Sequence, residues 1–371
     1  MNKKVKILAM YLPQYHEIPE NSEFWGNGFT DWVSTKNAKS YFKGHIQPKK
    51  PFNNYYYDLS NKKDIKWQID LAKKYSIYGF GIYHYWFSNK KVLLTKPAEL
   101  ILENKDLDIP FFFAWDNANW KRTWSTQRGN AWAPINDYEQ KNKSKDNSVL
   151  IKYEIGNKDS WKKHFDYLIP YFLDKRYIKI ENKPLFIIFN YSAEIKNMVE
   201  YWDILAKENG FDGFKIIYKK SKLNKIKKND ENFCYEPVYS GWNNIIKQII
   251  FKYKIIAGIK INGPYIYKYD DIWKKILINA KKRKKENEWL SGFVSYDDTP
   301  RRGKEGRIII GSSAEKFGYY LNELKKICIS QKKEFILLTA WNEWGEGAIL
   351  EPTEDDGYSY LEEVSSVINK E

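Results

Sequence analysis

Residues 335–347 read FILLTAWNEWGEG, and the pattern of this stretch, an apolar run followed by polar and aromatic residues, recurs along the chain. Its first part, Phe335–Trp341, is a short apolar run with strand character, and polar, acidic and aromatic residues follow it. Such a change matters because parallel α/β proteins bind their ligands beyond the carboxyl ends of their strands.

Eight short runs are rich in β-branched and aromatic residues, which is typical of buried strands. They are Val5–Tyr11, Tyr78–Tyr85, Ile109–Trp115, Pro184–Asn190, Phe214–Tyr218, Phe233–Val238, Gly292–Tyr296 and Phe335–Trp341. Segments with helical spacing lie between them: Lys62–Tyr75, Lys96–Asn104, Ser160–Arg176, Ala193–Asn209, Asp270–Lys285 and Ser313–Ser330. Strands that alternate with helices in this way predict an α/β protein of the (β/α)₈ or TIM barrel type.

The length of 371 residues exceeds the usual barrel size of about 250 and leaves room for loop insertions. We expect them at Glu17–Asn61, Asp116–Asp159 and Tyr239–Tyr269, on the carboxyl-terminal face. No Gly-, Ser- or Pro-rich linker divides the chain, so residues 1–371 are expected to form a single catalytic domain. A doubly wound sheet is the competing architecture, but no G-x-G-x-x-G follows an early strand.

The composition excludes several protein classes. The chain is 43% apolar and 17% aromatic, whereas disordered chains are poor in such residues and secreted disulfide scaffolds are rich in Cys. Cys234 and Cys328 form no C-x-x-C pattern and are expected to be reduced, packed thiols. Val5–Leu12 is too short for a signal peptide and no run is long enough to span a membrane, so a cytoplasmic protein is expected.

The net charge of +15 is concentrated in residues 215–285, where nineteen Lys and Arg stand against five Asp and Glu. A solvated surface is one interpretation of this bias, and an anionic partner is the other. Nucleic acid is not expected as a partner, because no binding-module motif accompanies the charge.

Polar and aromatic residues stand at the carboxyl ends of almost all the predicted strands. Tryptophan and tyrosine offer flat apolar faces, while Asn, Asp, Glu and His offer directional hydrogen bonds. A sugar presents both kinds of surface, so this mixture predicts a carbohydrate site. Packing in the core is the alternative for any one of these tryptophans.

Two carboxylates three residues apart, Glu343 and Glu346, form the sharpest feature. Glycoside cleavage needs one carboxyl that protonates the leaving oxygen and a second that acts as nucleophile, base or charge stabiliser. Gly345 and Gly347 would permit a turn that brings both glutamates to one site. Burial beside Trp341 and its neighbours would raise the pKa of the acid, as its role requires.

Other chemistries have less support. The four histidines show no metal-binding spacing, and neither a nucleophile elbow nor a phosphate-binding loop is present, so no metal and no cofactor is expected. Asp106–Asp108 has the D-x-D pattern of many nucleotide-sugar transferases. It precedes the third strand, however, and would lie at the wrong end of a barrel.

Five ordered motifs together resemble the WbsX-like proteins of bacterial O-antigen and capsule gene clusters, which are related to glycoside hydrolase family 99. The motifs are YLPQYH (11–16), FWGxGFTDW (24–32), WxNxNW (115–120), DxTPR (297–301) and WNEWxEGxxLEP (341–352). The resemblance runs from the first strand to the last and is weakest across residues 219–260.

The resemblance implies a (β/α)₈ barrel and a retaining mechanism on α-mannosides. In family 99 one Glu removes the proton of the sugar 2-hydroxyl, whose oxygen displaces the leaving group to give a 1,2-anhydro intermediate, and a second Glu is acid and then base. By position, Glu343 matches the first residue and Glu346 the second. Tyr11, His16, Trp86 and Asn342 would then help to line the reacting subsite.

The expected substrate contacts come from the strand ends and the quoted motifs. They are Tyr11, Tyr15, His16, Trp25, Tyr83, His84, Trp86, Trp115, Asn117, Trp120, Tyr191, Glu236, Asp297, Arg301, Asn342 and Trp344. Two departures from the family pattern stand out: Gly345 replaces the usual His, and Asp116 and Ala118 stand where relatives read W-A-N-E-N-W. The lost carboxylate at Ala118 leaves the mannose preference open.

Three functions remain open on the sequence. The first is cleavage of a bacterial surface polysaccharide or its lipid-linked precursor, the second is a glycosyltransferase or transglycosylase at the same site, and the third is a non-catalytic glycan-binding barrel. Ile245–Tyr269 also interleaves lysines with apolar residues, as a segment lying on an anionic membrane would. Peripheral contact with the inner membrane or a lipid-linked glycan is therefore one hypothesis, and a buried insertion is the other.

Overall fold

The structure is a computed structural model that describes residues 4–121, 149–221, 226, 229–242, 246, 249, 255–256, 259–260 and 263–370. Within these ranges, eight parallel strands form a closed barrel. In barrel order they are β1 (Lys6–Tyr11), β2 (Ile77–Ser88), β4 (Phe111–Trp115), β8 (Lys183–Ile188), β9 (Lys215–Lys219), β10 (Glu231–Phe233), β14 (Glu288–Phe293) and β16 (Phe335–Thr339). Each strand overlaps one of the eight predicted runs, and the predicted (β/α)₈ barrel is confirmed.

The barrel closes because β1 pairs with strands on both sides. Ile7 lies beside Ile77 of β2 and beside Ile336 of β16. Parallel strands that are covered on both faces are almost continuously apolar, and Phe111–Trp115 is buried at every position. The core is therefore built from the strands themselves, which leaves the loops free to carry polar groups.

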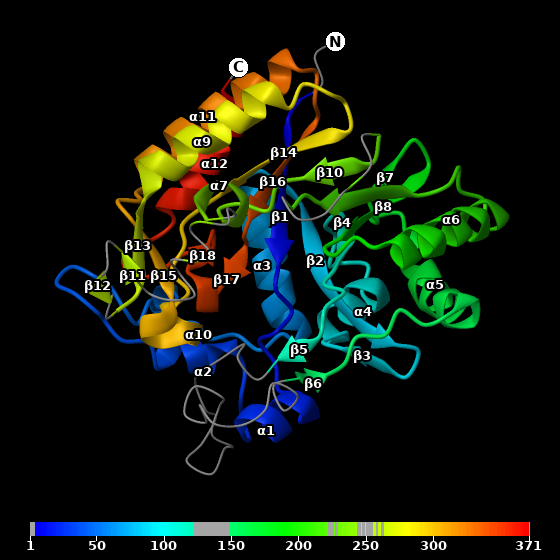
Figure 1. Ribbon diagram of the computed structural model, residues 1–371, viewed down its shortest axis with the longest axis horizontal. Helices are drawn as coiled ribbons and strands as arrows, with labels where there is room; N and C mark the ends of the chain where they lie inside the picture. The colour runs from blue at the N-terminus through cyan, green and yellow to red at the C-terminus, as the bar shows by residue number, and fades with distance from the viewer. Residues whose placement is uncertain are drawn as a thin grey trace.

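Helices cover the outside of the barrel (Figure 1). The longer ones are α3 (Lys62–Lys74), α4 (Lys96–Glu103), α5 (Lys158–Leu173), α6 (Ala193–Glu208), α9 (Tyr269–Lys282), α11 (Ala314–Ser330) and α12 (Ser359–Asn369). All six predicted helices occur, and α12 was not predicted. Asn157, Ser192 and Ser313 cap α5, α6 and α11 through their side-chain oxygens, which satisfies backbone N–H groups that would otherwise lack partners.

Shorter elements make up most of the connecting segments. They are α1 (Pro19–Trp25), α2 (Asp31–Lys36), η1 (Phe52–Asn54), β3 (Lys91–Leu93), β5 (Trp120–Lys121), β6 (Val149–Ile151), β7 (Lys179–Ile180), α7 (Val238–Gly241), β11 (Ile255–Ile256), β12 (Ile259–Lys260), β13 (Tyr265–Lys268), α10 (Thr299–Arg302), η4 (Gly303–Glu305), β15 (Arg307–Ile310), β17 (Asn342–Glu343), η5 (Trp344–Glu346) and β18 (Ala348–Ile349). The β1 arrow points downward in Figure 1, so the carboxyl-terminal mouth of the barrel lies in its lower part, with α1, α2 and α10. Both chain termini lie at the opposite end.

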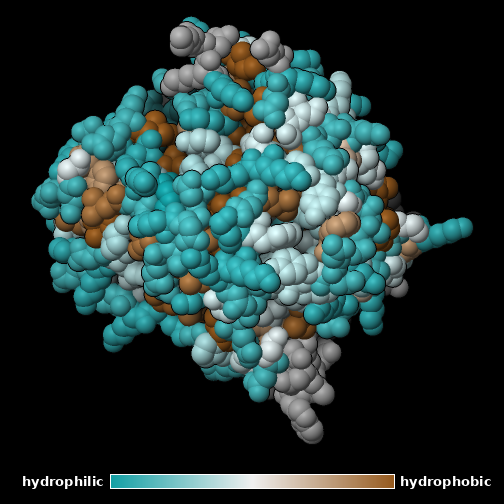
Figure 2. Space-filling view, turned by 180° about the vertical axis from the view of Figure 1, so that it is seen from behind, coloured by the Kyte–Doolittle hydropathy of each residue, from teal (hydrophilic) through white to brown (hydrophobic). Residues whose placement is uncertain are grey.

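Two of the predicted insertions lie partly outside the described residues. The described parts of Asp116–Asp159 include the antiparallel pair of β5 and β6, and those of Tyr239–Tyr269 include the β11–β12 pair. About half of Ile245–Tyr269, on which the membrane hypothesis rests, lies outside the described residues. In the part of the chain that is described, no helix combines the length and apolarity needed to cross a bilayer. The face seen from behind is largely hydrophilic, with hydrophobic residues in small patches (Figure 2).

Candidate active site

The loop after β16 carries both glutamates that the sequence singles out, and its backbone is fixed to β1. Glu343 ends β17 and Glu346 ends η5. The Asn342 side chain accepts a hydrogen bond from the Leu12 N–H at 2.7 Å and donates to the Leu12 carbonyl at 3.0 Å. Asn342 was expected to contact substrate, and the structure places its amide in a buried link between the first and last strand ends.

Tyr15 fixes the same loop from a second side. Its hydroxyl donates to the Asn342 carbonyl at 2.5 Å and accepts from the Trp344 N–H at 3.1 Å. The oxygen also lies 3.3 Å from Asp31 Oδ2. Since Tyr15 is 1% exposed, it holds the glutamate loop in position from behind.

Arg301 joins the two glutamates. Its Nη2 lies 3.0 Å from Glu343 Oε2 and its Nη1 lies 2.9 Å from Glu346 Oε1. Its Nε and Nη2 also donate to the two carboxylate oxygens of Asp31, at 3.1 and 2.9 Å. One planar guanidinium can contact all three carboxylates only if they face the same space. Glu343 and Glu346 therefore belong to one site at the mouth of the barrel.

Gly345 explains how Asp31 and Arg301 come so close to the loop. The Gly345 N–H donates to Asp31 Oδ2 at 3.0 Å. A Cβ at this position would lie 2.4 Å from Arg301 Nε and 2.6 Å from both Asp31 oxygens. The ion pair thus occupies the space in which a side chain of residue 345 would begin, which gives the departure from the family's usual His a physical reason.

Burial and like charge raise the pKa of both glutamates. Burial raises the pKa of Glu343 to about 8, and the charges of Glu346 and Asp31 add to this, while Arg301 opposes it. Burial likewise raises the pKa of Glu346, again against Arg301. The Glu346 side chain is 22% exposed and that of Glu343 is 5% exposed. Burial and mutual repulsion thus disfavour the simultaneous ionisation of the two carboxyl groups.

Tyrosines from two strands stand beside this pair. The hydroxyls of Tyr83 and Tyr235 lie 2.7 Å apart. Burial raises the pKa of both, and the charges of Glu343 and Glu346 raise it further. Tyr85 is affected by Glu343 in the same way, after the larger effects of burial and Asp116. Tyr83 and Tyr85 thus point into the barrel mouth from β2.

The alternate residues of β2 point away from the glutamates. His84 Nε2 lies 2.8 Å from His164 Nε2 of α5, and Trp86 stacks on the His164 ring at 4.3 Å. Trp115 packs on the same histidine at 4.8 Å and donates from its indole N–H to the Trp86 carbonyl. Burial lowers the pKa of His84 to about 3, so the ring is neutral. The expected substrate residues His84, Trp86 and Trp115 therefore lie between the barrel and α5.

Tyr11 and Trp344 belong to a buried network around Glu351. The Tyr11 hydroxyl donates to Gln68 Oε1 at 2.7 Å, and Gln68 Nε2 donates to Glu351 at 2.7 Å. Glu351 also accepts from Tyr57 and from the indole N–H of Trp344, at 2.8 and 2.7 Å. Burial raises the pKa of Glu351 to about 7 against these donors. Both expected substrate residues thus support the wall of the site.

Trp25 and Trp120 form an aromatic row that leads to the site. Trp25 stacks on Phe29 at 5.2 Å and meets the edge of Trp120 at 6.3 Å. Trp120 in turn packs against Tyr85 at 5.6 Å. Trp120 is half-buried and Trp25 is buried, so the row is reached through Trp120.

Three further expected residues lie in the segments that follow strands β1, β4 and β8. Asn117 exchanges hydrogen bonds of 2.7 Å with the Asn190 carbonyl and N–H and so ties the ends of β4 and β8 together. Tyr191 is half-buried and packs edge-on against Tyr218 at 5.1 Å. His16 is buried, and burial lowers its pKa.

Asp297 supports Glu346 through the backbone. Its N–H donates to the Glu346 carbonyl at 2.6 Å. Its carboxylate accepts from His45 Nε2 at 2.7 Å, from Gln47 at 2.6 Å and from the Thr299 hydroxyl at 2.6 Å. The His45 Nδ1 accepts from a backbone N–H, so Nε2 carries the proton. Burial opposes ionisation, but these hydrogen bonds outweigh it and lower the pKa of Asp297.

Glu236 follows β10 and turns toward α7. Its carboxylate accepts hydrogen bonds from the Ser240 N–H and hydroxyl at 2.9 and 2.7 Å. Burial raises its pKa to about 7. Its neighbour Tyr235, and not Glu236, stands beside Glu343 and Glu346.

Sequence reasoning missed several groups at the mouth: Asp31, Tyr85, Asp116, Lys219 and Tyr235. Asp31 lies within one of the quoted motifs, but nothing in the sequence pairs it with Arg301, 270 residues away. The two tyrosines could have been found from the alternation of side chains along a strand. Among the described residues, no group of three or more His, Cys, Asp or Glu side chains is arranged to hold a metal ion.

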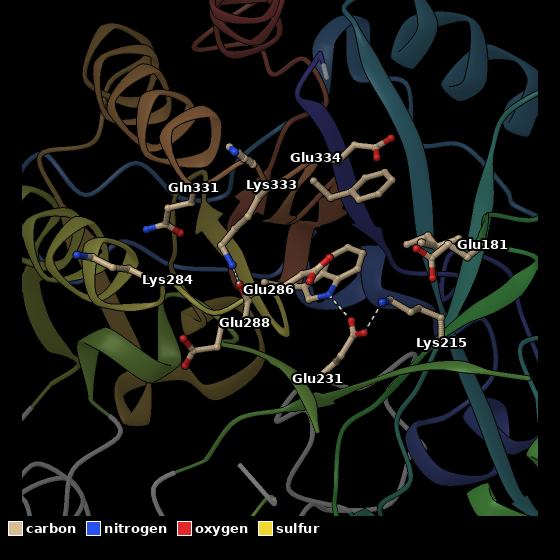
Figure 3. Close-up of a pocket in the computed structure, with 13 residues that line it drawn as sticks. Glu181, Lys215, Glu231, Lys284, Glu286, Glu288, Gln331, Lys333 and Glu334 are labelled. Atoms are coloured by element: carbon tan, nitrogen blue, oxygen red, sulfur yellow. Dashed lines mark hydrogen bonds and ion pairs between the residues drawn. The ribbon is translucent and has the colours of Figure 1, made fainter. Parts of the chain in front are cut away.

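A cavity of about 400 Å³ lies at the other end of the barrel (Figure 3). Its lining includes Lys215, Glu231, Glu288 and Phe335, which are the first residues of β9, β10, β14 and β16. Glu231 pairs with Lys215 and accepts from the Trp289 indole N–H at 2.8 Å. In TIM barrels this amino-terminal end stabilises the fold and the opposite end carries the chemistry. No catalytic role is therefore assigned to the cavity.

Comparison with known proteins identifies the family of this chain. Residues 7–364 match the family described as Glycosyltransferase WbsX. The chain belongs to the WbsX family. The sequence-based resemblance is thus confirmed, and the family description is that of enzymes acting on sugars.

Curated relatives and solved structures extend the comparison. WxcX from two strains of Xanthomonas campestris pv. campestris, an uncharacterized protein, is 24% identical over 98% of this chain. The WbsX chain spans about half the length of these relatives. The GH99 endo-alpha-mannosidase from Bacteroides thetaiotaomicron superposes with a TM-score of 0.58 at 14% identity, covering 98% of this chain and 96% of that one. A glycoside hydrolase-like protein gives the same TM-score at 11% identity, covering 100% and 95%. These structures share the fold.

Proposed function

We propose that this WbsX protein cleaves a glycosidic bond by a retaining mechanism in which Glu343 and Glu346 are the catalytic carboxyl groups. The contact of Arg301 with both glutamates carries the proposal, because it brings two carboxyl groups of raised pKa to one point at the carboxyl end of the barrel. Glycoside cleavage requires such a pair. The family description and the fold shared with a GH99 endo-alpha-mannosidase support the same class of chemistry.

The proposed first step uses one ionised and one protonated carboxyl group. Glu343 takes the proton of the sugar 2-hydroxyl, and the freed oxygen attacks C1 of the same ring. The bond between C1 and the leaving oxygen breaks as Glu346 gives its proton to that oxygen. The products are a 1,2-anhydro sugar on the enzyme and a released hydroxyl group.

In the second step the same groups act in reverse. Glu346, now ionised, takes a proton from water, and the water oxygen attacks C1 and opens the three-membered ring. Glu343 returns its proton to the 2-oxygen. Two inversions at C1 give net retention. Glu346 is the more exposed carboxyl group, which suits the one that must meet both the leaving group and water.

The proton of the pair must move between these two groups. Burial favours the proton on Glu343 in the free protein, since its pKa is raised to about 8, whereas the mechanism starts with the proton on Glu346. The two carboxyl groups are joined through Arg301, so a substrate hydroxyl bound by Glu343 would favour its ionised form and shift the shared proton to Glu346. The active form is then the pair with one proton.

The substrate class that fits this site is a bacterial surface polysaccharide or its lipid-linked precursor, with an α-mannoside as the first linkage to test. Transfer to an acceptor sugar in place of water is the second candidate, and the family description as glycosyltransferases favours it. Both reactions would use the same two glutamates. Peripheral membrane contact through the basic segment stays a prediction.

The test is release of new reducing ends from α-mannoside oligosaccharides and from purified surface polysaccharide. Glu343→Gln and Glu346→Gln are each expected to lower the rate by about 1000-fold or more, while sugar binding is retained. Glu305→Gln, which alters an acidic residue of η4, serves as the matched control.

Each outcome of this test separates the candidates. Release only in the presence of an added acceptor would establish transfer. Sugar binding without cleavage or transfer would support the third candidate, a non-catalytic glycan-binding barrel. A Glu343→Gln protein as active as the parent would end the proposed mechanism.

A further inference from the structure

A second charged pair stands at the barrel mouth: Asp116 directly follows β4, and Lys219 is the last residue of β9. The strand register aligns one residue of each strand in a row: Trp115 of β4, Ile188 of β8 and Tyr218 of β9. The next residues in the chain are Asp116, Phe189 and Lys219. Adjacent strands lie about 4.8 Å apart, so these three side chains start close together at the carboxyl end of the barrel.

Asp116 faces the barrel mouth. Trp115 points outward against His164, and successive side chains of a strand alternate between its faces. The charge of Asp116 is the largest influence on Tyr85 after burial, and Tyr85 also senses Glu343. Asp116 thus lies on the same side of the barrel wall as the catalytic pair.

Lys219 reaches the same space from β9. Its Nζ lies 4.6 Å from the centroid of the Phe189 ring and 6.0 Å from that of Tyr235. These are cation–π distances, and they hold the ammonium group over the ring between the two strands. Tyr235 is hydrogen-bonded to Tyr83 beside the glutamates, so Lys219 borders the catalytic site.

Burial of these two charged groups is energetically unfavourable. Burial lowers the pKa of Lys219 and raises that of Asp116, and each charge partly offsets the effect on the other. Among the described residues, neither charged group has a side-chain hydrogen bond or an ion pair within 4 Å, and both residues are half-buried and partly open to solvent. Two opposite charges that border one site and are not paired with other side chains offer an acceptor and a donor to a ligand.

We propose that Asp116 and Lys219 form a sugar subsite next to the catalytic pair and that they select a neutral, hydroxylated ring. Asp116 would accept a hydrogen bond from one hydroxyl, and Lys219 would donate to the oxygen of a neighbouring one. A charged ring gains no net attraction from a pair of opposite charges, because one of them opposes it whichever sign it carries, and its own charge loses hydration on binding. The pair therefore disfavours both uronic acids and amino sugars. The inference rests on the proposed function and assigns its substrate class.

The experiment is an NMR titration with the methyl α-glycosides of mannose, glucose and galactose and with the corresponding uronic acids. The wild-type protein is expected to bind at least one neutral glycoside more tightly than its uronic acid. Lys219→Met, which keeps the length of the side chain over Phe189, is expected to weaken neutral binding about tenfold, the loss of one charge-assisted hydrogen bond. Asp116→Asn is expected to reduce or reverse the preference for the neutral glycoside over its uronic acid, since Lys219 would then attract the carboxylate of the uronic acid.

The matched control is Lys220→Met. Lys220 is the next residue and follows the strand toward the opposite face, where its Nζ lies 3.8 Å from Glu288. This variant should bind as the wild type does. Thermal melting checks that the variants fold.

Wild-type binding that Lys219→Met and Asp116→Asn leave unchanged would overturn the subsite. Tighter wild-type binding of the uronic acids, or no binding of any probe, would overturn it as well. The proposed function is judged separately by the release of reducing ends, so a failure of the subsite and a failure of catalysis are distinguishable.

Discussion

Arg301 is the residue on which the charge balance of the site depends. It contacts Asp31, Glu343 and Glu346, and it is 4% exposed. Its positive charge opposes the rise in the pKa of both glutamates that burial causes. A buried guanidinium that serves three carboxylates is geometrically specific, because a lysine ammonium cannot present donors in the same plane.

Arg301→Lys is therefore expected to lower kcat on the order of 100-fold, comparable to the loss of one preorganised charge contact. The carboxyl group that must be ionised loses part of its stabilisation, so the rising limb of the pH–rate profile should move to higher pH. Rates measured from pH 5 to 9 check both effects. Arg302→Lys is the control, since Arg302 pairs with Asp298 at 3.2 Å and its charge, which also lowers the pKa of Glu346, is kept by Lys. An unshifted profile for Arg301→Lys would contradict the assigned role.

At the scale of elements, the short η5 helix works because residue 345 has no side chain. Gly345→Ala would drive a methyl group to within 2.4 Å of Arg301 Nε and 2.6 Å of Asp31. We expect a loss of about 1–3 kcal/mol in the free energy of unfolding, typical of overpacking, together with a large loss of activity. Denaturant unfolding and initial rates measure the two effects. Gly241→Ala, whose new methyl would lie 3.4 Å from its nearest neighbour, should change neither.

The strands show how much of the site could be predicted from the sequence. The ends of β2 and β4 were recognised as polar and aromatic, and these segments do reach the mouth. Consecutive residues such as Tyr83 and His84 were both assigned to substrate, although the alternation of a strand lets only one of them face the barrel. Trp115 was predicted to contact substrate and Asp116 was not, although Asp116 is the one that faces the barrel. The sequence thus predicts where along each strand the site lies better than it predicts which side chains face the barrel.

At the scale of the whole molecule, local sequence patterns predict the barrel, whereas the site is formed by contacts that exist only when the barrel is closed. Eight apolar runs and the helices between them predict the fold, because each pattern is contained in a few neighbouring residues. The contact of Asp31 with Arg301 joins residues 270 positions apart, and no local pattern encodes it. Such contacts exist only once β1 and β16 have paired.

Closure also buries several carboxyl groups, and this sets the pH dependence of stability. Burial raises the pKa of Glu236 and Glu351 to about 7 and that of Glu343 to about 8. A carboxyl group whose pKa is higher in the folded than in the unfolded state stabilises the fold below the unfolded value near 4.5, and this contribution is lost as pH rises through the folded value. The buried, neutral rings of His84 and its partner His164 have lowered pKa values. Their contribution to the stability of the fold is therefore lost only as pH falls below about 6.5.

The two trends oppose each other below pH 6.5. Above pH 7 the carboxyl groups lower the stability as pH rises, and the thiols of Cys234 and Cys328, whose pKa burial raises to about 12, act in the same direction. The free energy of unfolding should therefore fall by on the order of 2 kcal/mol between pH 7 and pH 9. Thermal melting across this range measures the slope. Glu343→Gln removes the group that titrates nearest pH 8 and should flatten the decline, whatever its effect on stability at pH 7. A surface variant such as Glu362→Gln should keep the wild-type slope, and a Glu343→Gln protein with that same slope would show that Glu343 is ionised throughout the range.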